Sequence, residues 1–153
     1  MRIYLGLGTN LGDKELNLRV AVQKIEERIG KVISLSAFYA TAPWGFQSDN
    51  NFLNAAAGVE TSLSPFDILA STQRIEQEIG RLHKSHDGVY SDRLIDIDLL
   101  LYGDKILQDE RLSLPHPLMA ERKFVLEPLA EIAPDVVHPV LHKTIRELFL
   151  VLS

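Results

Sequence analysis

The order of strand-like and helix-like segments constrains the fold of this chain more than any other feature. Four short segments are rich in strand-forming residues: 2–8, 32–40, 52–60 and 94–102. Between them, residues 18–29 and 68–79 repeat apolar side chains at helical spacing. Ser64, followed by Pro65 and Asp67, is a cap for the second helix, and Gly30 and Gly80 each supply a stop. This is the split βαβ order. We therefore predict an α+β fold, a ferredoxin-like βαββαβ antiparallel sheet with helices packed on it and a C-terminal appendage.

The part of the chain after residue 102 is predicted to form that appendage. Prolines scattered between residues 103 and 153 divide it into short elements, and a last helix is expected at 144–152. The chain has 153 residues, of which 46% are hydrophobic, and this is enough to bury the core of one domain. We therefore expect residues 1–153 to form a single domain.

The charge and composition exclude several functions. A formal net charge of −5 argues against nucleic-acid binding, which needs a broad basic surface. No apolar stretch could span a bilayer, so we expect a cytoplasmic protein without a membrane partner. The absence of cysteine removes disulfides, thiol nucleophiles and cysteine zinc sites. One segment is locally basic, which points either to a small anionic ligand or to a solvated loop: Arg81, His83, Lys84, His86 and Arg93.

The tripeptide Asp96-Ile97-Asp98 is the most informative local motif. Residues i and i+2 of a strand point to the same face, so both carboxylates project together from an otherwise apolar segment. Burying two unpaired like charges there would be costly. The pair therefore either binds cations, for which Mg²⁺ with its preference for hard oxygen ligands is suited, or lies on an exposed sheet face.

Two further polar positions are weaker signals. Gln73 and Glu76 share a face of the helix expected at 64–80, near a C-terminus where the helix dipole disfavours acids. A nearby arginine or a ligand donor would compensate Glu76 and Glu78, but a solvated helix face explains this pattern better than a binding site does. His116 is held in extended geometry by the prolines on either side and either donates to a phosphate or is structural.

The glycine-rich segment 5–12 hints at a phosphate loop. It is neither a Walker sequence nor a complete dinucleotide fingerprint, and a turn after the first strand suffices to explain it.

In these residues and their spacing, the chain resembles the 6-hydroxymethyl-7,8-dihydropterin pyrophosphokinases of folate biosynthesis. The matching segments run almost from end to end and keep their order and spacing: 8–12, 38–43, 52–56, 73–76, 80–81, 93–103, 114–117, 122–129 and 131–134. The resemblance departs at His83, where a second arginine is common, and at Tyr90, which stands in place of a tryptophan.

The resemblance implies a role for individual residues. Asp96 and Asp98 are expected to hold two Mg²⁺ ions that bridge the ATP phosphates, and Arg81 and Arg93 to assist catalysis. The positions expected to contact ATP are Gln73, Glu76, His83, Lys84, Arg93, Leu99, Arg111, Ser113, His116 and Arg122. The positions expected around the pterin are Thr41, Ala42, Pro43, Trp44, Phe52, Asn54, Tyr90 and Phe124.

The implied reaction is attack of the pterin hydroxymethyl oxygen on the β-phosphorus of ATP, with release of AMP. Such a transfer needs positioning and charge neutralisation more than a protein nucleophile. The partners expected are ATP and the pterin alcohol, and we expect a monomer. Three alternatives stay open: another nucleotide-dependent transferase on the same sheet, a non-catalytic nucleotide- or pterin-binding module, and a protein interaction domain.

Overall fold

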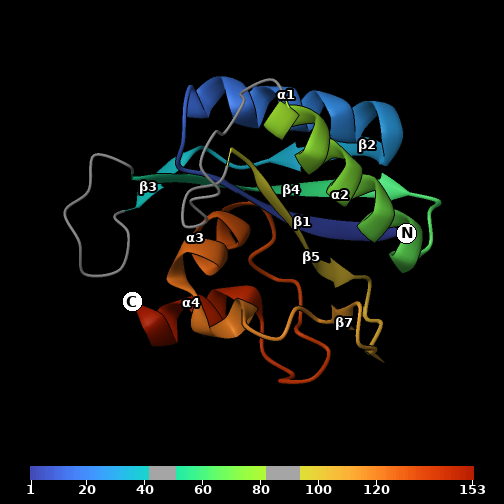
Figure 1. The fold of residues 1–153 in the computed structure, drawn as a ribbon. Coiled ribbons are helices and arrows are strands. Elements are labelled where there is room, and N and C mark those ends of the chain that lie inside the picture. The colour runs from blue at the N-terminus through green and yellow to red at the C-terminus, as the bar shows by residue number, and fades with distance from the viewer. Residues whose placement is uncertain (42–50, 82–93) are drawn as a thin grey trace.

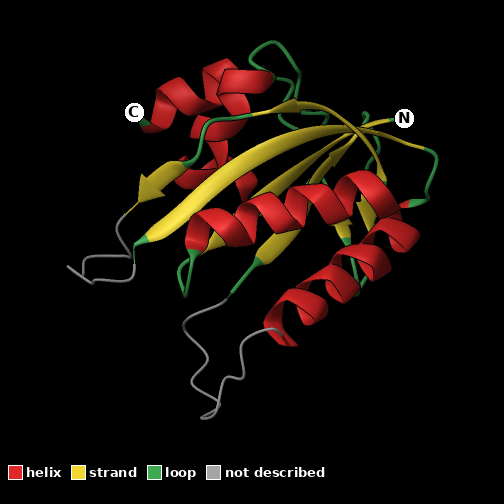
Figure 2. Cartoon of the chain, turned by 90° about the horizontal axis from the view of Figure 1, so that it is seen from above, coloured by secondary structure: helices red, strands yellow, loops and turns green. Residues whose placement is uncertain are grey.

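The computed structural model describes residues 1–41, 51–81 and 94–153 and forms three layers. An antiparallel sheet lies in the middle, with α1 and α2 on one face and the C-terminal helices α3 and α4 on the other (Figure 1). Seen from above, α1 and α2 lie side by side across the strands (Figure 2). None of the helices in the described ranges is both long and apolar enough to span a bilayer.

The sheet has the strand order of a ferredoxin-like fold. Its elements are β1 (Arg2–Thr9), β2 (Gly30–Leu35), β3 (Tyr39–Thr41), β4 (Phe52–Thr61) and β5 (Asp96–Tyr102). The order is β2-β4-β1-β5, with β3 also paired to β4, and all pairings are antiparallel. The predicted βαββαβ sheet is therefore confirmed.

The two predicted helices form because their ends are capped and one face of each is apolar. In α1 (Lys14–Arg28), the Asp13 side chain accepts from Leu16 N–H at 3.1 Å. In α2 (Pro65–Arg81), Ser64 Oγ accepts from Asp67 N–H at 3.2 Å, as the sequence predicted. The buried stripes of both helices pack on one face of the sheet and form the main core: Leu18, Ala21, Ile25, Ile68, Ile75 and Ile79 with Ile3, Leu5, Leu7, Ala57 and Val59.

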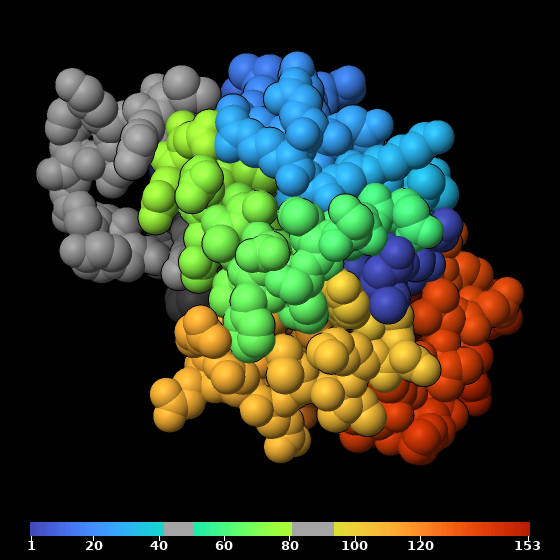
Figure 3. Space-filling view, turned by 90° about the vertical axis from the view of Figure 1, so that its right-hand side faces the viewer, coloured from blue at the N-terminus to red at the C-terminus, as the bar shows by residue number. Residues whose placement is uncertain are grey.

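The C-terminal part covers one half of the other face. It consists of β6 (Leu107–Gln108), β7 (Ser113–Leu114), the 3₁₀ turn Met119–Glu121, α3 (Lys123–Ile132) and α4 (Ile145–Leu152). A second core joins these elements to the sheet through Tyr4, Ala56, Leu100, Leu101, Met119, Leu126, Leu129 and Leu148. In Figure 3, α2 (green) lies between α1 (blue) and the segments that follow β5 (yellow to orange). The other half of this face carries the polar side chains of Asn54, Asp96 and Asp98.

A β-bulge in β5 lets this strand contribute side chains to both hydrophobic cores. Leu5 pairs with Leu99 and Tyr4 pairs with Leu101, so Leu100 is an extra residue on β5. As a result Leu99 packs toward α1 and α2, while Leu100 and Leu101 both pack toward α3 and α4. The bulge therefore separates the polar half of β5, which carries Asp96 and Asp98, from its fully apolar half.

Two details of the prediction were wrong. The strand expected at 32–40 is split into β2 and β3, because Ser36 Oγ accepts from Ala56 N–H at 2.9 Å and so takes the place of a backbone acceptor. Helix α3 was not predicted. Proline usually ends a helix, but Pro128 lies inside α3 and is buried.

Substitution at Gly30 will test how closely β2 and β4 approach. A Cβ at Gly30 would lie 2.0 Å from the carbonyl oxygen of Glu60, which is backbone and cannot move aside cheaply. We expect Gly30→Ala to lower the free energy of unfolding by about 3 kcal/mol or more. Gly80→Ala is the matched control, since a Cβ there meets nothing within 4 Å, and it should raise stability by about 0.5–1 kcal/mol. Urea denaturation measures both, and equal effects would contradict the prediction.

The buried side chain of His138 should make stability depend on pH. It is 5% exposed, and its Nδ1 accepts from the N–H groups of Val140 and Leu141 at 3.2 and 3.1 Å. Burial, and then the nearby His142, lower the pKa of His138 below its ordinary 6.5. As the pH falls, the histidine is therefore protonated in the unfolded chain before it is protonated in the folded one. The free energy of unfolding keeps its full value above about pH 6.5 and decreases as the pH drops below it.

The His138→Asn variant isolates this contribution. Asparagine Oδ1 can accept in place of Nδ1 and does not titrate. We expect the free energy of unfolding of the wild type to fall more steeply than that of the variant between about pH 7.5 and 5. Parallel curves would show that His138 does not contribute.

Candidate active site

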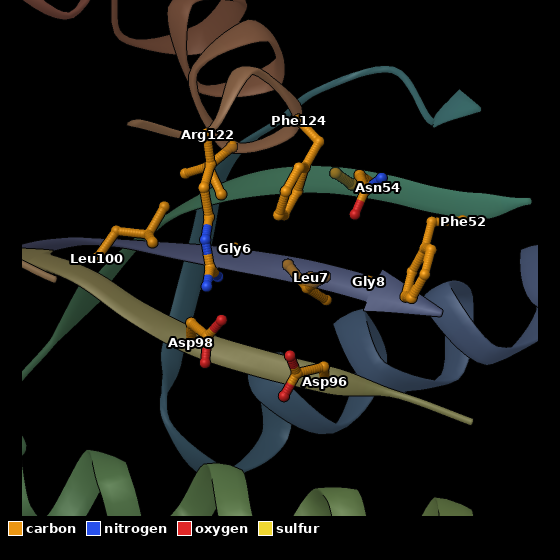
Figure 4. Close-up of a pocket in the computed structure, with 12 residues that line it drawn as sticks. Gly6, Leu7, Gly8, Phe52, Asn54, Asp96, Asp98, Leu100, Arg122 and Phe124 are labelled. Atoms are coloured by element: carbon orange, nitrogen blue, oxygen red, sulfur yellow. The ribbon is translucent and has the colours of Figure 1, made fainter. Parts of the chain in front are cut away.

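Beside α3, the same face of the sheet forms a pocket whose floor is made of small residues. Gly8 of β1 pairs with Asn54 of β4 on one side and with Asp96 of β5 on the other. Gly6 pairs with Asp98 in the next row. Cross-strand partners project to the same face, so the glycines leave open the space between the amide and the carboxylates. The resulting cavity has a volume of about 240 Å³ (Figure 4).

Asp96 and Asp98 line this cavity and are half-buried, while Ile97 between them is buried in the core beneath α2. Both carboxylates project from β5 into the pocket, as the i, i+2 spacing predicted (Figure 4). Asp98 also lines an adjoining pocket of about 230 Å³ on the other side of β5. The pair therefore lies where two binding spaces meet.

Glu76 of α2 adds a third carboxyl group beside the pair. Its Oε2 accepts from Ile97 N–H at 2.7 Å. The pKa of Glu76 is raised to about 7: burial is the largest cause, the hydrogen bond from Ile97 opposes it, and the charge of Asp96, the side-chain hydrogen bond between Glu76 and Asp96 and the charge of Asp98 add to it. A cation bound beside these three carboxyl groups would favour their ionised forms.

The neighbouring Glu78 is compensated differently. Arg28 and Lys24 of α1 both bond to its carboxylate, and the bond from Arg28 is the main cause that lowers the pKa of Glu78 to about 2. The expectation of a compensating arginine is confirmed for Glu78, and the compensation of Glu76 comes from a backbone donor instead.

The first pocket has an amide and two aromatic rings in its walls. Asn54 is 5% exposed, and its Nδ2 donates to Thr41 Oγ1 at 2.8 Å. This bond orients the amide, so that Oδ1 faces the floor, where a Cβ at Gly8 would lie 3.0 Å from it. Phe52 and Phe124 line the pocket from β4 and α3 (Figure 4). The combination suits a flat heterocycle with donor groups along one edge.

Arg122 joins this wall to the acidic floor. Its guanidinium carbon lies 5.6 Å from the centre of the Phe124 ring, and its side chain extends from the start of α3 toward the floor of the cavity (Figure 4). The pocket therefore offers a positive charge opposite Asp96 and Asp98.

The adjoining pocket is lined by residues far apart in the sequence. Leu99 comes from β5, Ser113 from β7, and His116 and Arg111 from the loops beside β7. Arg111 lies with its guanidinium carbon 4.3 Å from the centre of the Phe66 ring. Hydroxyl, imidazole and guanidinium groups beside an apolar wall suit a nucleotide, whose base is flat and whose phosphates accept hydrogen bonds.

His116 is held in one tautomer. It follows a cis Leu114–Pro115 bond, and its backbone N–H donates to the carbonyl oxygen of Leu100 at 2.9 Å. On the ring, Nδ1 accepts from the backbone N–H of Leu118 at 3.2 Å. Burial and the charge of Arg122 lower the pKa of His116, and Asp96 opposes them. A neutral ring with an accepting Nδ1 carries its proton on Nε2, so His116 can donate to an anion.

The described part of the chain contains most of the predicted site residues. The first pocket gathers Phe52, Asn54, Asp96, Asp98, Arg122 and Phe124, and the second gathers Asp98, Leu99, Arg111, Ser113 and His116. Thr41 accepts a hydrogen bond from Asn54, and Glu76 accepts one from the backbone N–H of Ile97, which lies between Asp96 and Asp98. Gln73 is exposed on α2, one turn before Glu76, and lines neither pocket.

The remaining predicted positions lie outside the described residues, and their roles stay predictions: Ala42, Pro43, Trp44, His83, Lys84, Tyr90, Arg93 and the side chain of Arg81. Among the described residues, no group of three or more histidine, aspartate or glutamate side chains is arranged to hold a metal by itself.

Sequence reasoning missed the floor of the pocket. Gly6 and Gly8 belong to the segment that hints at a phosphate loop, and both lie inside β1, within the predicted strand 2–8. Glycines at i and i+2 in a strand, like Asp96 and Asp98, were the available signal. It became informative only once the register placed these pairs opposite one another.

The fold and the site together define a ferredoxin-like α+β protein with an acidic pocket on the face of its sheet opposite α1 and α2. Residues 4–134 match the family model of the 7,8-dihydro-6-hydroxymethylpterin-pyrophosphokinases. The chain belongs to this family.

Curated relatives agree over most of their length. The 2-amino-4-hydroxy-6-hydroxymethyldihydropteridine pyrophosphokinase of Porphyromonas gingivalis is 49% identical over 139 residues, which cover 90% of this chain and 93% of the relative. The enzymes of the same name from Methylorubrum extorquens and Aquifex aeolicus are 46% and 39% identical, and each alignment covers 95% of this chain and 90% and 88% of the relative.

A solved structure supports the fold alone. The HPPK-DHPS triple mutant of Plasmodium falciparum with STZ-DHP aligns with a TM-score of 0.80 at 19% identity. The alignment covers 99% of this chain but only 43% of that longer chain.

Proposed function

We propose that this chain transfers pyrophosphate from ATP to the hydroxymethyl group of 6-hydroxymethyl-7,8-dihydropterin and releases AMP, a step of folate biosynthesis. The observation that carries the proposal is the position of Asp98, which lines both the aromatic pocket and the pocket beside His116. A transfer between two ligands requires their reacting groups to meet at one place, and the acidic pair is at that place. Family membership and the names of the relatives support the same reaction.

The aromatic pocket is proposed to bind the pterin. Phe52 and Phe124 would contact the two faces of the ring, and Asn54 Oδ1 would accept from an N–H of its edge. Thr41 would keep the Asn54 amide in the accepting orientation. We propose that Ala42, Pro43, Trp44 and Tyr90 complete this pocket.

The adjoining pocket is proposed to bind ATP. Leu99 would contact the adenine, Ser113 and Arg111 would bond the ribose or phosphates, and His116 Nε2–H would donate to a phosphate oxygen. Arg122 would reach the phosphates from the pterin side. Gln73, His83, Lys84, Arg81 and Arg93 remain proposed contacts of the same triphosphate.

Asp96 and Asp98 are proposed to hold two Mg²⁺ ions together with phosphate oxygens. Their chemistry fits, because Mg²⁺ takes one or two carboxylates plus substrate phosphates rather than a complete protein cage. Such a cation would also favour the ionised form of the nearby Glu76, whose pKa is raised by burial and by both aspartates. Bound there, Mg²⁺ would supply positive charge against the triphosphate.

The residues of the chain contribute by positioning. The floor formed by Gly6 and Gly8 lets the ring lie close to the sheet, with its hydroxymethyl group directed toward Asp98. The hydroxymethyl oxygen attacks the β-phosphorus and its proton passes to solvent. The bond between the β-phosphorus and the oxygen that bridges the α- and β-phosphates breaks, and AMP leaves with that oxygen. Arg122 and His116 are placed to offset the charge of the phosphates.

AMP formation tests the proposal directly. Purified protein is incubated with ATP, Mg²⁺ and the pterin alcohol, and AMP is measured with each component omitted in turn. We expect AMP only in the complete mixture. Equal AMP without the pterin would refute the acceptor, and binding of both ligands without AMP would favour a non-catalytic binding module. Action as a monomer in the cytoplasm, without a nucleic-acid partner, stays a prediction.

A further inference from the structure

The free edge of β5 is held by two hydrogen bonds that lie on either side of Asp98. In the described part of the chain, β5 pairs with β1 and with no other strand. On its outer edge, Ile97 N–H donates to Glu76 Oε2 at 2.7 Å, and Leu100 O accepts from His116 N–H at 2.9 Å. Without such partners the edge of a strand exposes its backbone groups and frays.

The bond from Glu76 is made at the residue between the two acids. Asp96 and Asp98 flank Ile97, so any rotation of the backbone at Ile97 changes the direction of one carboxylate relative to the other. Groups that share a ligand must be held to within about 0.5 Å to function. We propose that Glu76 is a positioning residue: through Ile97 N–H it holds the edge of β5 so that the Asp96 and Asp98 carboxylates face the same ligand. The inference rests on the proposed function and departs from a direct contact between Glu76 and ATP.

A glutamate at position 76 is expected to lower the stability of the fold. Glu76 is half-buried and lies beside two further carboxylates. A glutamine could accept from the same N–H without adding a negative charge. The hydrogen bond and the charge can therefore be separated by substitution, and the positioning role depends on the hydrogen bond.

Two variants separate the effect of the hydrogen bond from the effect of the charge. Glu76→Gln keeps the acceptor and removes the charge, whereas Glu76→Ala removes both. We expect Glu76→Ala to lower kcat by about 10- to 100-fold and to raise the Mg²⁺ concentration for half-maximal activity, as loss of a supporting group does at metal sites. We expect Glu76→Gln to stay within about threefold of the wild type, since the acceptor is retained.

Glu78→Ala is the matched control on the same helix. Its carboxylate bonds to Lys24 and Arg28 of α1 and not to β5. It should change stability without changing kcat or the Mg²⁺ requirement. If Glu76→Ala behaves like Glu78→Ala, the positioning role is refuted. If Glu76→Gln falls as far as Glu76→Ala, or if only the KM for ATP rises, the charge or a direct ATP contact is responsible and the inference is wrong.

A measurement without turnover distinguishes this inference from the proposed function. Amide hydrogen exchange should accelerate at Ile97 in Glu76→Ala and remain slow in Glu76→Gln, while Leu5 in the core of β1 stays unchanged as the internal reference. Broadening of the Asp96 and Asp98 amide signals by Mn²⁺ should weaken only in Glu76→Ala. Unchanged exchange at Ile97 and unchanged broadening in that variant would overturn the inference, even if the protein makes AMP. The expected pattern in a protein that makes no AMP would leave the positioning standing and refute the reaction.

Discussion

Asp98→Asn will lower kcat by about 100- to 1,000-fold, the size of losing one electrostatic contact to a transition state. Asp98 lines both the aromatic pocket and the pocket beside His116, so its carboxylate is the group most directly between the two substrates. Asparagine keeps the size of the side chain and removes the charge that would hold Mg²⁺. Steady-state AMP formation at saturating ATP and pterin, over a series of Mg²⁺ concentrations, measures the effect.

The control is Asp135→Asn, which removes a carboxylate that is 79% exposed and bonds to Arg146 near α4. It should leave kcat unchanged. The melting temperature of Asp98→Asn should not fall, because removing one of three neighbouring carboxyl groups relieves repulsion in the metal-free protein. Wild-type kcat in Asp98→Asn, or an unchanged Mg²⁺ requirement, would show that the metal is held elsewhere.

Asn54→Leu will raise the KM for the pterin by about 10- to 100-fold, which corresponds to about 1.4 to 2.8 kcal/mol of binding free energy. Asn54 is almost fully buried, and the bond from its Nδ2 to Thr41 Oγ1 leaves Oδ1 facing the pocket. Leucine has a similar volume but leaves the ring N–H of the pterin without an acceptor. Fluorescence titration with the pterin, beside steady-state kinetics, measures the change.

The KM for ATP serves as the internal control, because Asn54 does not line the pocket beside His116. Thr41→Val should have a smaller effect of the same kind, since it removes only the group that orients the amide. An equal rise in both KM values would indicate general damage to the fold, and an unchanged KM for the pterin would refute the assignment of the aromatic pocket.

The sequence alone predicted the elements that depend on local spacing. The apolar stripe of 68–79 and the cap at Ser64 required only the geometry of a helix, and both are present in α2. The common direction of Asp96 and Asp98 required only the alternation of a strand. The split of 32–40 and helix α3 escaped prediction, because Ser36 meets a distant strand and Pro128 is buried among residues from other elements.

The tertiary structure decided what lies opposite these residues. Strand register placed Gly6 and Gly8 beside the acidic pair, and the bulge at Leu100 placed a carbonyl where His116 could bond to it. Glu76 meets Ile97, 21 residues away, only because α2 packs along β5. The physical reason is that backbone geometry sets the direction of neighbouring side chains, whereas the pairing of distant segments depends on how the whole core packs. The sequence determined which groups the site contains, and the packing determined that Asp98 lies between two pockets.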